Sequence, residues 1–259
     1  MKVDCLASSS AGNCYILSFE GMPPLMVECG IPYRSILRRC NKLNLDLSQI
    51  KNCLVTHAHG DHSLAAKDLS KRGVTIWANE ETLKLCKVMG GCLENHKPIL
   101  IQEGMKVMAF PVDHDIEGAV GFVIKTKKEC VIFVNDHKKW DVNLGNFKPD
   151  YVFIECNYNQ RIVYAQYNEL TRISKLRGIS PAELKENNIK LAQVTRNIKS
   201  HCSLNGTIHG LQKLNLDNCK AIFLMHLSNR YANEYLMKNE VYRHTGIKTF
   251  VCGREGGTK

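Results

Sequence analysis

The hydrophobic residues of this chain come in short runs separated by polar stretches, and four of these runs end alike. Each is rich in β-branched or aromatic residues and is bounded by polar residues, which is typical of a buried strand. Each is followed within two residues by a histidine or an aspartate. The four runs are 53–56, 107–112, 131–134 and 221–225. Because ligand sites in α/β sheets gather beyond the carboxyl ends of the strands, we expect the four endings to surround one cleft.

The rest of the pattern alternates further strands with helices. Strands are expected over residues 2–6, 13–18 and 25–28, the first two around a turn of small residues at 8–13. Helices are expected from Pro32 to about Leu43, through most of 158–201 with Pro181 opening a new helix, near 204–214 and near 231–240. No repeat, low-complexity tract or Pro/Gly-rich linker interrupts this pattern. The sequence therefore predicts one α/β domain over 1–259, with a helical insertion near 158–200.

Composition is that of an ordinary globular protein, with 44% hydrophobic and 23% charged residues among 259. The first residues lack a basic stretch followed by an apolar segment, and no run approaches the roughly 18–20 apolar residues that span a bilayer. Twelve cysteines are scattered singly, with no Cys-x-x-Cys pair. Buried free thiols in a reducing compartment explain them better than a disulfide framework does. We therefore expect a soluble, cytoplasmic protein without a membrane partner.

The net charge of +10 is uneven along the chain. Residues 160–200 contain eight Lys or Arg against three Glu. A solvated helical face and a track for nucleic acid both explain this excess, and the sequence leaves the two open.

Four candidate metal ligands lie within six residues: His57, His59, Asp61 and His62. Imidazole nitrogens and carboxylate oxygens suit Zn²⁺ and similar divalent ions. So compact a group does not wrap comfortably around one tetrahedral ion, which favours two adjacent ions that take further ligands from the other strand endings. His137 is a competing ligand, but adjacent residues at a strand end face opposite ways.

The assignment that follows gives each ion four protein ligands. The first ion takes His57, His59 and His114, the second takes Asp61, His62 and His226, and Asp136 bridges the two. Zn²⁺ is the expected metal, with Mn²⁺ as the alternative.

The segment His57–His62 resembles the His-x-His-x-Asp-His signature of the metallo-β-lactamase superfamily. His114, Asp136 and His226 follow in the order in which that family places its other ligands. The resemblance implies a four-layer αββα sandwich with two metal ions. It says little about the substrate, because one scaffold serves many reactions.

Four other segments resemble the YycJ/VicX-type (WalJ-like) exonuclease branch of the superfamily. They are Leu6–Cys14, Ile154–Asn157, Ser200–Leu204 and Met225–Glu234. One departure is Glu28-Cys29-Gly30, where the family usually has Asp in place of Glu28. The resemblance implies that Glu28 braces the metal-binding turn from behind.

The expected chemistry is attack by a water that two cations activate. Asp61 would orient that water and accept its proton. By resemblance to related phosphodiesterases, His201 would contact the scissile phosphate or protonate the departing oxygen, whereas the plainer alternative is a helix-capping or solvent-facing histidine.

The sequence thus predicts a two-metal-dependent phosphodiester hydrolase. A nuclease is favoured, and in particular a DNA exonuclease, with DNA preferred to RNA as substrate. The alternative is a small-molecule metallo-hydrolase that acts on a cyclic nucleotide, another phosphodiester or a thioester. A binding module without catalysis would be expected to lack some of the ligands, and all seven are present.

Overall fold

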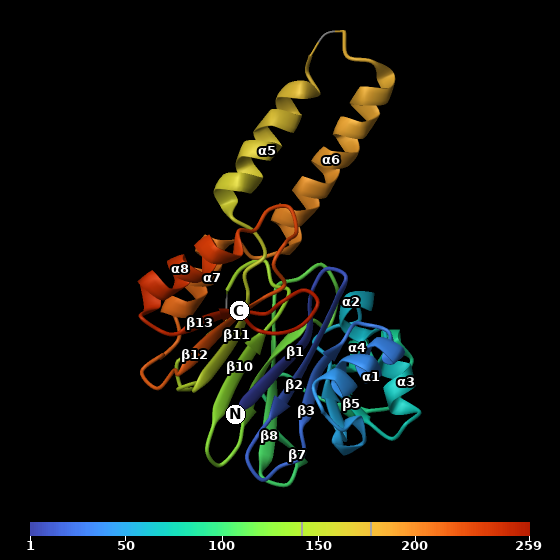
Figure 1. The fold of residues 1–259 in the computed structure, drawn as a ribbon, viewed down its shortest axis with the longest axis vertical. Helices are drawn as coiled ribbons and strands as arrows, with labels where there is room; N and C mark the ends of the chain where they lie inside the picture. Colours follow the sequence, from blue (N-terminus) through green and yellow to red (C-terminus); the bar gives the residue numbers. More distant parts are fainter. Residues whose placement is uncertain (141, 177) are drawn as a thin grey trace.

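The computed structural model describes residues 1–140, 142–176 and 178–259. Two β-sheets pack face to face, and helices cover the outer face of each (Figure 1). The predicted four-layer αββα sandwich is confirmed.

The N-terminal half forms a six-stranded sheet. Its strands, in spatial order, are β1 (Lys2–Ser9), β2 (Gly12–Ser18), β3 (Leu25–Cys29), β4 (Asn52–Leu54), β5 (Thr75–Ala78) and β6 (Gly91–Cys92). The first three strands are antiparallel neighbours, and β3 to β6 are parallel. The helical segments of this half are α1 (Tyr33–Lys42), the short 3-10 helix η1 (Leu47–Gln49), α2 (Gly60–Ser63), α3 (Ala66–Ser70) and α4 (Glu80–Cys86).

The second sheet has seven strands. Their spatial order is β13 (Thr249–Val251), β12 (Ala221–Met225), β11 (Tyr151–Glu155), β10 (Cys130–Val134), β9 (Val120–Lys125), β8 (Met105–Pro111) and β7 (Ile99–Gln102). Strands β10 to β13 are parallel, and β8 runs in the same direction as β10 because both are antiparallel to β9. The carboxyl ends of β8, β10, β11 and β12 therefore meet at one edge of the sheet. Helices α7 (Leu204–Gln212) and α8 (Glu234–Thr245) cover its outer face (Figure 1).

The core lies in three layers that the alternation of side chains along the strands dictates. Between the sheets, Tyr15 packs edge-on against Phe133, which stacks on Phe153. Ile36 of α1 belongs to the outer layer of the first sheet, and Met237 of α8 to that of the second. Because both faces of each sheet are buried, the ends of the strands are held in fixed positions.

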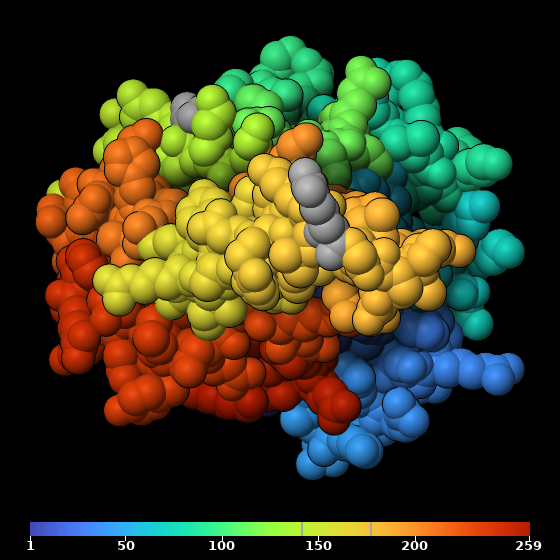
Figure 2. All heavy atoms as spheres, turned by 90° about the horizontal axis from the view of Figure 1, so that it is seen from above, coloured from blue at the N-terminus to red at the C-terminus, as the bar shows by residue number. Residues whose placement is uncertain are grey.

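Helices α5 (Gln160–Ile173) and α6 (Pro181–Ser200) form a hairpin that stands away from the sandwich (Figure 1). Ser180 caps α6, and its side chain and that of Glu183 exchange hydrogen bonds with each other's backbone N–H groups, so α6 begins at Pro181. The two helices pack through Val163 and Val194, among others. Figure 2, which looks down on the hairpin, shows it above the middle of the body. Arg177, part of the predicted basic excess, lies outside the described residues.

Two predicted elements have different limits in the structure. The first strand continues to Ser9, so the turn that follows is shorter than the small-residue stretch suggested. The helix expected near 231–240 begins at Glu234, because the Asn233 side chain accepts a hydrogen bond from the backbone N–H of Leu236, and it runs to Thr245. Within the described residues, no helix has the length and apolar character needed to cross a membrane.

Candidate metal centre

The His57–His62 turn begins in the loop after β4 and ends in α2. His57 and His59 are on the loop, and Asp61 and His62 are in the first turn of α2. The chain after β3 packs directly against this turn: a Cβ on Gly30 would lie 1.7 Å from the carbonyl oxygen of Asp61. Glycine at position 30 therefore permits the close backbone approach that holds the turn in place.

Three further side chains reach the same place from the second sheet. His114 follows β8, Asp136 follows β10 and His226 follows β12. Asp136 and His226 have positive φ angles of 46° and 55°. This left-handed conformation costs a non-glycine residue roughly 1–2 kcal/mol and is often found at functional sites. The structure thus brings together all seven residues that the sequence singled out as ligands.

His57, His59 and His114 form the first group. Nδ1 of His59 lies 3.1 Å from Nε2 of His57 and 3.3 Å from Nε2 of His114. Behind the site, Nδ1 of His114 donates to the carbonyl of Ser200 at 3.1 Å, so its Nε2 faces inward toward His59. Burial lowers the pKa of His57 and of His59, with a smaller contribution from neighbouring imidazoles. His57 and His59 are therefore held neutral, the form that binds metals.

The second group contains Asp61, His62 and His226 around Asp136. Oδ2 of Asp61 lies 3.4 Å from Nε2 of both His62 and His226. Oδ2 of Asp136 lies 3.3 Å from Nε2 of His62, and its Oδ1 lies 3.6 Å from Nε2 of His226.

The carboxylate of Asp136 stands between the two groups. Its Oδ2 is also 3.7 Å from Nε2 of His114 and 4.0 Å from Nε2 of His57. Burial alone would raise the pKa of Asp136, but His226 and His62 outweigh it and hold that pKa well below its usual value. Burial would likewise raise the pKa of Asp61, yet hydrogen bonds to His226 and His62 keep it low. Both carboxylates are therefore ionised and offer their oxygens to the site.

Glu28 supports the turn from behind. It is fully buried, with φ at 61°. Its Oε1 accepts a hydrogen bond from the Thr56 hydroxyl at 2.5 Å and lies 3.3 Å from Nδ1 of His62. The longer side chain thus still reaches the residues that an acidic group at this position would brace.

His201 follows α6 and faces the same pocket. Its Nδ1 lies 2.6 Å from Oε1 of Glu155, the buried last residue of β11. Burial alone would lower the pKa of His201, but Glu155 outweighs it and raises that pKa to about 9. The ring therefore carries a proton at neutral pH.

Glu155 was not among the predicted site residues, although it lies in the segment Ile154–Asn157 that resembles the exonuclease branch. The run 151–155 ends in an acidic residue and so matches the pattern of the other four strand endings, a signal that could have identified it. His137, the competing ligand, lies away from both groups, edge-on to Trp140 and with Nδ1 3.6 Å from Oε2 of Glu155.

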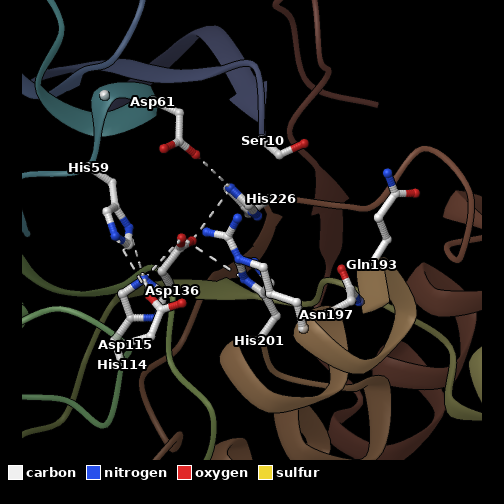
Figure 3. Close-up of a pocket in the computed structure, with 12 residues that line it drawn as sticks. Ser10, His59, Asp61, His114, Asp115, Asp136, Gln193, Asn197, His201 and His226 are labelled. Atoms are coloured by element: carbon white, nitrogen blue, oxygen red, sulfur yellow. Dashed lines mark hydrogen bonds and ion pairs between the residues drawn. The ribbon is translucent and has the colours of Figure 1, made fainter. Parts of the chain in front are cut away.

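A pocket of about 370 Å³ opens over these groups. His59, Asp61, His114, Asp136 and His226 point toward one another on one side, and Gln193, Asn197 and His201 approach from α6 (Figure 3). The pocket lies where the hairpin meets the sandwich.

Comparisons with known proteins agree with this architecture. Residues 9–86 match the model of the metallo-beta-lactamase superfamily, a stretch that includes the His57–His62 turn. The chain has the metallo-β-lactamase fold.

Solved structures of this fold align with nearly the whole chain. The metallo-β-lactamase fold protein YhfI from Bacillus subtilis aligns with a TM-score of 0.69 at 11% identity. The alignment covers 99% of this chain and 98% of YhfI. Zn²⁺-bound PqqB from Methylobacterium extorquens aligns with a TM-score of 0.67 at 13% identity, over 100% of this chain and 99% of PqqB. The short form of human tRNase Z aligns with a TM-score of 0.56 at 16% identity, over 100% of this chain and 98% of the tRNase Z chain.

Among curated proteins, the chain is similar to exodeoxyribonuclease YycJ from Bacillus anthracis. The two are 22% identical over 139 residues, which is 51% of this chain and 52% of the relative. The aligned part therefore spans about half the length of that relative.

Proposed function

We propose that this metallo-β-lactamase-fold chain is a two-metal-dependent phosphodiester hydrolase, and specifically a nuclease that degrades DNA from an end. The observation that carries the proposal is the position of Asp136, whose carboxylate lies within 4.0 Å of imidazole nitrogens of both ligand groups. A carboxylate has two oxygens, so one residue in this position can serve two ions.

The residues present fit a pair of divalent ions. Within each group the candidate ligand atoms lie within 4.8 Å of one another. Oδ1 of Asp136 is buried without a hydrogen-bond partner among the described residues. Buried polar atoms are rarely left so, and bound ions beside Asp136 would satisfy its free oxygen. The mixture of nitrogen and oxygen ligands suits Zn²⁺ first and Mn²⁺ second.

Divalent ions held here would lower the pKa of a water in the pocket and offset the negative charge that develops on the substrate. Asp61, ionised and partly exposed at the pocket wall, would orient that water and accept its proton. His201, protonated through its contact with Glu155, would donate a proton to the departing oxygen. An acid and a base on opposite sides of the pocket suit hydrolysis of a diester.

Two observations favour nucleic acid as the substrate. The chain has a net charge of +10, and the basic hairpin borders the pocket. Two similar proteins, an exodeoxyribonuclease and a tRNase, are named for cleavage of nucleic acids. We favour DNA because the sequence resemblance is to the former.

The test is a cleavage assay with the protein loaded with Zn²⁺ or Mn²⁺, on DNA and RNA labelled at the 5′ or the 3′ end. We expect end-directed degradation of DNA that chelator abolishes and metal restores. Asp136→Asn should be inactive, and the matched control Asp113→Asn, an exposed aspartate of the loop after β8, should retain activity. Hydrolysis confined to a chromogenic phosphodiester or a thioester would instead indicate a small-molecule hydrolase.

A further inference from the structure

The hairpin has more positive charge than its own acidic residues can pair. Glu169 pairs with Arg172 and Glu186 with Lys190, while Glu183 caps the start of α6. The cations that remain without an ion pair among the hairpin residues the structure describes are Arg161, Lys175, Lys185, Arg196 and Lys199. Charges left unpaired on a projecting element are available to an anionic partner.

Three of these cations share one face of α6. Lys185, Arg196 and Lys199 are linked by steps of three and four residues through Ile189 and Ala192, the spacing of a single helical face. All five residues are exposed. Lys199 follows Lys185 by 14 positions in α6 (199 − 185), so this face extends for roughly 21 Å at 1.5 Å per residue.

Arg196 lies where this face meets the metal centre. It lines the pocket with Asp61, His114 and Asp136, and it also lines a groove along α6 with Thr195 and Lys199. Gln193 and Asn197, its neighbours on α6, also line the pocket. Histidines apart, Arg196 is the one cationic side chain among the described residues that line the pocket. One residue therefore joins the pocket to the exposed helix.

We propose that Arg196, with Lys199 and Lys185 on either side of it along α6, binds the backbone phosphates that flank the scissile diester. The face they form on α6 thus makes the hairpin a substrate-binding arm that selects polynucleotides over small phosphodiesters. This inference rests on the proposed function and names a specificity determinant for it. A guanidinium binds a phosphate through two parallel hydrogen bonds, which a lysine cannot reproduce.

The dimensions of the face set the length of substrate that it favours. A length of roughly 21 Å spans about six phosphates at the 3.4 Å axial spacing of one DNA strand. Binding should therefore strengthen with chain length up to about that number of nucleotides and then level off.

The experiment measures binding separately from turnover. A fluorescein-labelled single-stranded DNA of about 20 nucleotides is titrated in chelator, where no cleavage occurs, at several salt concentrations. Arg196→Ala should weaken binding by about tenfold, the loss of one charge-assisted contact, and reduce the slope of log affinity against log salt by about one. Arg196→Lys should keep the salt slope and recover part of the affinity. The matched control is Arg38→Ala, an exposed cation of α1 that should bind as the unaltered protein does.

Turnover then tests the specificity. With metal-loaded protein, Arg196→Ala should raise KM for the oligonucleotide and lower kcat/KM for it by more than it lowers kcat/KM for bis(p-nitrophenyl) phosphate. Unaltered DNA affinity and salt slope in Arg196→Ala, or an equal loss on the small diester, would overturn the inference. If the unaltered protein binds DNA through Arg196 in chelator but cleaves no nucleic acid with any metal, the proposed function fails while the binding arm stands.

Discussion

The Nδ1 atom of His201 lies 2.6 Å from Oε1 of Glu155, and that carboxylate is completely buried. The contact fixes a proton on Nδ1. It also orients the imidazole ring so that another edge faces the pocket. A charged imidazole beside the metal centre is the group that a departing alkoxide requires, because it can donate a proton.

This pairing predicts an alkaline limit to activity. The pKa of His201, raised to about 9 by Glu155, means that the proton is present at neutral pH and is lost as the pH rises through that value. Glu155→Gln removes the main cause of the raised pKa, so the alkaline limb of the rate profile on DNA should move to lower pH. A limb that stays in place would show that His201 is not the acid.

His201→Ala tests the same residue by its effect on rate. General acid catalysis typically contributes about 10²–10⁴-fold, and we expect kcat on DNA to fall within that range. The loss should be smaller on bis(p-nitrophenyl) phosphate, whose departing group needs no proton. Metal content should not change, and His209→Ala, an exposed histidine of α7, serves as the control. Loss of metal in His201→Ala would mean that this residue is a ligand.

Glu28 should act on metal affinity. Its carboxylate lies 3.3 Å from Nδ1 of His62 and orients a ring that faces Asp136. Replacing a residue that orients a ligand typically weakens metal binding about 10–100-fold, and Glu28→Gln should do so in a competition with a chromogenic chelator. Glu103→Gln, an exposed residue between β7 and β8, should not. Equal affinity in both variants would contradict the bracing role.

Gly30 should be required for stability. A Cβ at this position would lie 1.7 Å from the Asp61 carbonyl oxygen, so Gly30→Ala must push the turn away from β3. We expect the free energy of unfolding to fall by about 1–3 kcal/mol or more. Gly60→Ala, where an added Cβ meets nothing within 4 Å, should change it by less than about 0.5 kcal/mol. Denaturant titration of the two metal-free variants measures the difference.

Much of the fold and the grouping of the candidate ligands could be predicted from the sequence. Strand runs have a recognisable composition, and the ends of parallel strands must meet at one edge. That rule correctly predicted that Asp136 and His226 lie together. The four-layer αββα sandwich was predicted from the resemblance of the His57–His62 turn to the metallo-β-lactamase signature.

Other features leave little trace in the sequence. The acceptor for Nδ1 of His114 is a backbone carbonyl, that of Ser200, which any residue would provide. The positive φ angles of Asp136 and His226 arise at residues other than glycine, so no glycine marks them. The direction in which the α5–α6 hairpin projects depends on how its base docks, and helical periodicity alone does not determine this.

The central claim is that seven side chains hold two divalent ions around one shared carboxylate. The most direct test is elemental analysis of protein reconstituted with Zn²⁺ and freed of loose metal by gel filtration, with Asp136→Asn and Asp113→Asn in parallel. We predict two ions per chain for the unaltered protein and for Asp113→Asn, and fewer for Asp136→Asn. No bound metal in the unaltered protein, or two ions retained in Asp136→Asn, would contradict the account.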